Sequence, residues 1–178
     1  MNELAFSQFL QQLDTLSEKG STDMIYSLLD QGFIDFPQHI SELYYWKAQL
    51  YLKLGEYNLA VAELHKGIEK GGWWNPVSLT TKPEWKVLYG YDEFDRIVRH
   101  CSHQLEKESK DSKWKLLIKG EQSERALFSI HWKGSNVKDF SQYWSCSNLK
   151  MGFLQSSQVH AYHSFNWDQH DIALQDMR

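Results

Sequence analysis

The stretch LYYWKAQLYLKLGEYNLA, residues 43–60, decides how the first half of the chain folds. Its apolar and aromatic residues recur every three or four positions, the spacing of one helix face. Gly55 interrupts the spacing and predicts the end of a helix over residues 41–53. A second helix then starts near Tyr57 and continues to the pair Gly71-Gly72. The stretch therefore predicts two helices joined by a tight glycine turn.

The same pattern occurs 35 positions earlier in the chain. A period of roughly 30–40 residues is typical of stacked helix pairs. We therefore expect one helix over residues 3–18 and another that ends at Gly32. The matched pairs are Phe9 and Tyr44, Leu13 and Ala48, Leu16 and Tyr51, Gly20 and Gly55, Ile25 and Ala60, Leu29 and Leu64, and Gly32 and Gly67.

A third, incomplete unit follows, because Gly90 lies 35 positions after Gly55. Apolar spacing after Gly90 predicts a closing helix to about residue 107. Pro76 and Pro83 disfavour a helix before it, so we expect a loop over 73–84 and a short turn at 85–89. The polar stretch that follows predicts that a helical domain, residues 1–110, ends there.

The second helix pair resembles a tetratricopeptide repeat. Tyr44, Ala48 and Tyr51 stand at the aromatic, small and aromatic positions of the family's first helix, and Ala60 at the small position of its second. Lys47 departs from the usual Leu, and Gly67 from the usual Ala.

The resemblance implies a protein-binding module, and the candidate residues for a peptide groove are Tyr45, Lys47 and Lys53. Tyr44 and Tyr51 are interpreted as core residues between the helices.

Residues 111–178 have a different pattern. Alternation over 114–119, an apolar run over 126–131 and residues 151–154 predict strands, the run at 126–131 being typical of a buried one. Helices are expected over 137–144 and 168–177. We therefore expect an α+β chain in two parts, an all-α helical-hairpin repeat followed by a small, partial α/β sheet unit.

This second part resembles the beginning of an α/β-hydrolase of the phospholipase/carboxylesterase type. The stretch His131-Trp132-Lys133-Gly134-Ser135 matches the family's oxyanion-hole loop. The stretch 155–158, Gln-Ser-Ser-Gln, and the pair Trp167-Asp168 follow in the family's order. The resemblance implies that His131 positions this loop, and a role as a catalytic base is the alternative.

The family's Gly-x-Ser-x-Gly nucleophile motif is absent from the 178 residues, so no catalytic residue is assigned. We therefore expect a protein-interaction or scaffold module with a catalytically incomplete hydrolase remnant. The alternative is the N-terminal portion of a serine hydrolase, for which a small ester would be a substrate only in a full-length form.

A sheet of so few strands leaves an open edge and an uncovered face. It would pack on the helical repeats, form a homodimer through the open edge, or not fold by itself. The net charge of −4 gives no attraction to nucleic acid, and we expect a protein of the cytoplasm that does not bind membranes. His160, His163 and His170 are weak candidates for a metal site, the alternative is a solvated loop, and no cofactor is expected.

Overall fold

The computed structural model describes residues 3–19, 22–120, 126–131, 134–144 and 149–177, without the side chains of residues 3, 4, 19 and 170. The chain divides into two compact units, which we call the helical unit (Met1–Ser102) and the sheet unit (His103–Arg178). The predicted boundary at residue 110 lies near the end of a helix, α6, that begins in the helical unit and continues into the sheet unit. Each unit is described by itself below.

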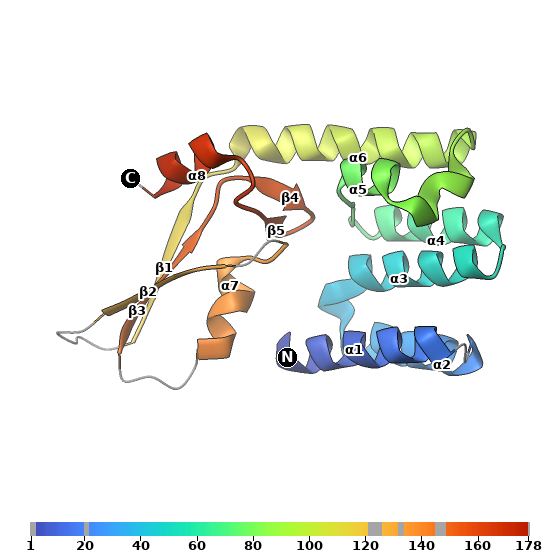
Figure 1. Ribbon diagram of the computed structural model, residues 1–178, viewed down its shortest axis with the longest axis horizontal. Coiled ribbons are helices and arrows are strands. Elements are labelled where there is room, and N and C mark those ends of the chain that lie inside the picture. Colours follow the sequence, from blue (N-terminus) through green and yellow to red (C-terminus); the bar gives the residue numbers. More distant parts are fainter. Residues whose placement is uncertain (1–2, 20–21, 121–125, 132–133, 145–148, 178) are drawn as a thin grey trace. The chain divides into compact units, whose positions relative to one another are not determined.

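The helical unit consists of helices that follow one another through short connections (Figure 1). The 35-residue offset appears in the start points of α2 and α4, and the turns at Gly55 and Gly90 both have positive φ, +75° and +86°. The elements are α1 (Glu3–Lys19), α2 (Thr22–Asp35), the 3-10 helix η1 (Pro37–His39), α3 (Ile40–Lys53), α4 (Tyr57–Glu69), α5 (Pro76–Thr81), the 3-10 helix η2 (Pro83–Leu88) and α6 (Asp92–Asp111).

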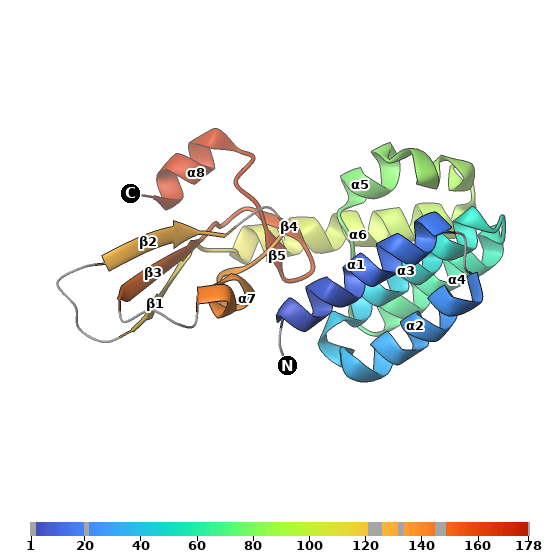
Figure 2. The same ribbon diagram turned by 60° about the horizontal axis from the view of Figure 1, so that its bottom comes forward.

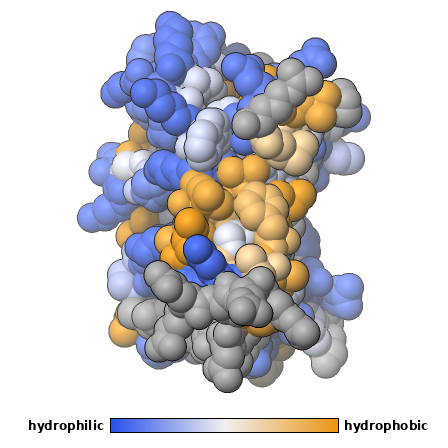
Figure 3. All heavy atoms as spheres, turned by 90° about the vertical axis from the view of Figure 1, so that its left-hand side faces the viewer, coloured by the Kyte–Doolittle hydropathy of each residue, from blue (hydrophilic) through white to orange (hydrophobic). Residues whose placement is uncertain are grey.

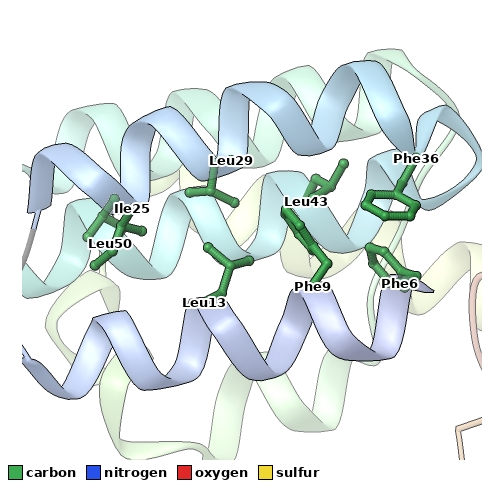
Figure 4. Packing of buried hydrophobic residues seen from close by; sticks show 8 residues of the cluster. All are labelled: Phe6, Phe9, Leu13, Ile25, Leu29, Phe36, Leu43 and Leu50. Atoms are coloured by element: carbon green, nitrogen blue, oxygen red, sulfur yellow. The ribbon is translucent and has the colours of Figure 1, made fainter. Parts of the chain in front are cut away.

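The core at the start of the helical unit lies between α1, α2 and α3. In Figure 4, side chains of α1 point toward those of α2, with residues of α3 beside them. Aromatic rings fill one end, where Phe6 and Phe9 each lie 5.2 Å from Phe36, centroid to centroid. The remaining members of the cluster are Leu13, Ile25, Leu29, Leu43 and Leu50.

Gly32 was expected to end the second helix, and the structure corrects this prediction. Gly32 does not end α2, which continues to Asp35. Gly32 is buried inside that helix, and a Cβ atom there would lie 2.4 Å from Cζ of Phe9. Gly67, its repeat partner, is likewise buried within α4, where a Cβ would lie 2.7 Å from Trp74. Both glycines therefore permit close packing of side chains against the helix.

The expected loop over 73–84 is also wrong, because most of it is helical. Pro76 is at the start of α5, where its missing N–H is not needed, and Asn75 caps the helix by accepting from the N–H groups of Val77 and Ser78. Pro83 likewise begins η2. The prolines start two short helices instead of preventing one.

The sheet unit contains, among its described residues, a three-stranded mixed sheet in the order β1-β3-β2. β1 (Lys115–Lys119) is antiparallel to β3 (Lys150–Gln155), and β2 (Ala126–Ile130) is parallel to it. The short helices α7 (Val137–Phe140) and η3 (Ser141–Trp144) connect β2 to β3. A small hairpin of β4 (Val159–Ala161) and β5 (Ser164–Phe165), which was not predicted, precedes α8 (His170–Asp176).

The strand register sorts the side chains of this sheet onto two faces. One face carries Leu117 and Phe153, which pack with Val137 and Phe140 of α7. α8 lies on the opposite side of the sheet from α7 (Figure 2). We call this opposite side the outer face.

The outer face is largely uncovered. Its two rows are Leu116–Leu154–Ile130 and Ile118–Gly152–Phe128. Phe128 is 60% exposed and Ile118 55%, so the expectation that β2 is buried is wrong. Figure 3 looks onto this side of the sheet unit and shows a continuous apolar area there. No helix in the described part of the chain is long and apolar enough to cross a membrane.

Candidate functional site

Buried polar residues gather where the parallel strands β2 and β3 end. His131 directly follows β2, and Ser156 directly follows β3, so the parallel pairing brings them together. Both are almost fully buried, at 1% and 0% exposure. The carboxyl ends of parallel strands are the usual place for ligand sites in α/β proteins, which makes this cluster the first candidate.

The histidine at this site is held as a hydrogen-bond acceptor. The backbone N–H of Ser156 donates to Nε2 of His131 across 3.2 Å. A neutral ring that accepts at Nε2 carries its proton on Nδ1, so this geometry assigns that tautomer. Because the Nε2 lone pair is already used, it does not face a serine hydroxyl as a general base would.

Asp176, at the end of α8, lies in the same cluster, and its hydrogen bonds go to the serines. Its carboxylate accepts from the hydroxyl of Ser156 at 3.0 Å and from the backbone N–H of Ser157 at 2.7 Å. The hydroxyl of Ser157 donates to both carboxylate oxygens, at 2.8 and 3.0 Å. In a catalytic triad the acid orients the histidine, whereas here it holds the serines and ties α8 to the end of β3.

The predicted oxyanion loop is fixed by the β4–β5 hairpin. The N–H of Gly134 donates to the carbonyl of Phe165 at 2.8 Å, and the N–H of Phe165 donates to the carbonyl of Ser135 at 2.9 Å. An oxyanion hole needs N–H groups that point at the reacting atom. The amide of Gly134 is therefore already paired within the protein, while Trp132 and Lys133 lie outside the described residues.

Two further residues of the hydrolase resemblance, Trp167 and Gln158, also hold the loops together. Nε1 of Trp167 donates to the carbonyl of His131 at 3.0 Å, and the two rings lie 5.3 Å apart. Gln158 and Gln169 exchange two hydrogen bonds, from Nε2 of Gln158 to the backbone carbonyl of Gln169 and from the backbone N–H of Gln169 to Oε1 of Gln158. These contacts join the segment after β3 to the segment before α8.

The weak metal candidates do not form a site within the described residues. There, no group of three His, Cys, Asp or Glu side chains is placed to hold a metal ion. Nδ1 of His160 lies 3.4 Å from the amide nitrogen of Asn166, and His163 is in a tight turn with φ of 52°. The side chain of His170 lies outside the described part of the chain.

The predicted groove residues of the helical unit each have an internal partner. The hydroxyl of Tyr45 accepts from Nε1 of Trp85 at 3.0 Å. Lys47 lies 3.5 Å from a carboxylate oxygen of Asp30, and Lys53 donates to the hydroxyl of Ser17. A peptide that used these side chains would have to displace those contacts.

A second candidate site, which the sequence did not indicate, is an open groove between α1 and α2. Its volume is about 920 Å³, within the range of ligand-binding clefts. The lining is mainly amide, hydroxyl and apolar side chains, and none of the described lining residues is charged. They are Gln8, Gln11, Gln12, Thr15, Leu16, Met24, Ser27, Leu28 and Gln31.

No family model matches the chain, and no curated protein matches it. Among solved structures, the chain is similar to the 2.75 Å crystal structure of an uncharacterized protein from Bacillus cereus ATCC 10987. The TM-score is 0.55 at 20% sequence identity, a likeness that concerns the fold. The match covers 99% of this chain and 58% of the other, so the chain spans little more than half of that protein's length.

Proposed function

We propose that this chain is a protein-binding module, with tetratricopeptide-like helix pairs as the binding part and the sheet unit as a hydrolase-like remnant without catalytic machinery. The observation that carries the proposal is the hydrogen bond from the Ser156 backbone to Nε2 of His131. It occupies the atom with which His131 would act on Ser156 if it were a base, and Asp176 holds the serine hydroxyl. In this proposal the Ser–His–Asp cluster stabilises the fold and does not catalyse hydrolysis.

The α1–α2 groove is the binding surface that we assign to the helical unit. Glutamine amides both donate and accept, so they match the alternating N–H and C=O groups of an extended peptide. Exposed Met24 and half-buried Leu16 and Leu28 provide apolar contacts beside them. Because the described lining is uncharged, the preferred ligand is an uncharged peptide whose affinity depends little on salt.

Selection of random displayed peptides on the immobilised chain, followed by calorimetric titration of the strongest binder, tests this proposal. We expect saturable binding that weakens at least about tenfold when Gln12 and Gln31 are both replaced by alanine. Replacement of the exposed Gln38, which lies outside the groove, is the matched control and should change nothing. If no peptide saturates, or if the groove variant binds like the wild type, the assignment fails.

A second candidate function is that of a serine hydrolase of which this chain is the N-terminal portion. It is favoured by the parallel β2–α7–β3 arrangement, which presents the loop at His131 and Ser135 at the carboxyl end of the sheet. Hydrolysis of p-nitrophenyl acetate at the rate of buffer alone is expected for this chain. Turnover above that rate, abolished by a serine-directed phosphonate, would contradict the absence of a nucleophile and favour the hydrolase over the binding module.

A further inference from the structure

The two outer strands of the sheet differ in charge. Among the described residues, β3 is paired on both sides, and β1 and β2 each have one edge without a partner strand. β1 begins and ends with lysine, at Lys115 and Lys119, which is a common protection of an exposed edge. β2, with the sequence Ala-Leu-Phe-Ser-Ile, has no charge and no proline, so nothing in it opposes pairing.

We propose that the free edge of β2 binds β2 of a second copy of this chain, forming a symmetric dimer with a continuous six-stranded sheet. This inference is independent of the peptide groove in the helical unit. A two-fold axis makes the paired strands antiparallel and places each residue opposite its mirror position. With the axis at Phe128, the two Phe128 side chains face each other, and Ala126 lies opposite Ile130 of the second copy.

This register places no charged side chains opposite each other and is complementary in size. The alanine leaves room for the larger isoleucine on the outer face, and the central aromatic pair is a favourable cross-strand contact. On the other face, Leu127 lies opposite Ser129. Phe128, Ile130 and Leu127 are all exposed in the single chain, at 60%, 45% and 38%, so pairing removes apolar surface from water.

The same symmetry at the β1 edge is unfavourable. An antiparallel pair centred on Leu117 would set Lys115 directly opposite Lys119 of the second copy, and would do so twice. Like charges directly opposite each other on neighbouring strands are destabilising. Charge therefore selects β2 as the edge at which the second copy binds.

Sedimentation equilibrium on the whole chain, over about 1 to 100 µM, tests the proposal. We expect a mass of twice 21.0 kDa at the upper end. Phe128→Lys should raise the dissociation constant by about 100-fold or more, because a symmetric interface contains each substitution twice. Ile118→Lys is the matched control, since it removes a similarly exposed residue from the same row at the other edge, and it should leave the dimer intact.

A disulfide experiment gives an independent readout. The chain has two cysteines, the buried Cys101 and Cys146, and the second is replaced by serine for this test. In that background Phe128→Cys should cross-link two copies on mild oxidation, because residues facing each other across antiparallel strands lie within disulfide range. Ile118→Cys should not cross-link. A monomer at every concentration would overturn the proposal, and so would a dimer that survives Phe128→Lys but dissociates with Ile118→Lys.

Discussion

Replacing Gly32 by alanine puts a methyl group where the ring of Phe9 now lies. The new Cβ would be 2.4 Å from Cζ of Phe9 and 3.0 Å from Cδ2 of Leu43. Carbon atoms pack best at about 3.5–4.0 Å, so the ring must move by roughly 1 Å. Phe9 is buried in the core of the helical unit and has little room to do so.

Two opposing effects set the size of the change. Overpacking of a filled core costs about 1–3 kcal/mol. Alanine in place of glycine inside a helix stabilises the folded state by about 1 kcal/mol. Because the 2.4 Å contact is a severe one, we expect a net loss of about 1–2 kcal/mol in the free energy of unfolding.

Urea unfolding followed by helical circular dichroism measures this loss. In a Phe9→Leu background the ring is gone, so Gly32→Ala should become neutral or stabilising, a coupling that a double-mutant cycle isolates. Gly55→Ala is the control, since that position has φ of +75° and nothing within 4 Å, and it should cost about 1 kcal/mol with no coupling to Phe9. If Gly32→Ala stabilises the protein that still has Phe9, the close packing described here is wrong.

Three further predictions concern buried groups and a helix cap. Asp176→Ala removes the acceptor of Ser156 and Ser157, so we expect about 2–4 kcal/mol of destabilisation, seen as faster amide exchange in the sheet unit. Burial raises the pKa of the Cys101 thiol to about 11. The stability that this shift contributes is therefore complete below the pKa of an unfolded thiol and is lost as the pH rises toward 11. Unfolding titrations from pH 8 to 11 on the wild type and on Cys101→Ala measure this loss. Asn75→Ala removes the cap of α5 and should cost about 1 kcal/mol by thermal unfolding.

The helices of the first half could be predicted from local spacing, but the roles of single residues could not. A glycine late in a helix pattern looks like a helix end, and only the position of Phe9 shows that Gly32 is a packing site. A proline looks like a helix breaker unless the residue before it caps the helix, as Asn75 does before Pro76. Both errors arise because the deciding contact is absent from the local pattern.

The sheet unit shows the same limit for faces and distant partners. Alternation around Leu116 and Ile118 predicts a strand, but it does not say which face the rest of the chain covers. Asp176, which holds the serines after β3, gave no signal in the sequence because its partners lie 19 and 20 positions away. His131 was predicted to position a loop. The structure shows in addition that its Nε2 accepts from the backbone N–H of Ser156, so this atom is not available to take a proton from the Ser156 hydroxyl.

The central claim, that this module binds without catalysing, depends on the serines at the end of β3 being unreactive. Intact-mass measurement after incubation with a fluorophosphonate tests it directly, because such reagents modify serines that a base activates. We predict no adduct on Ser156 or Ser157 in the folded chain. A stoichiometric adduct on either serine, lost in His131→Gln, would contradict the account.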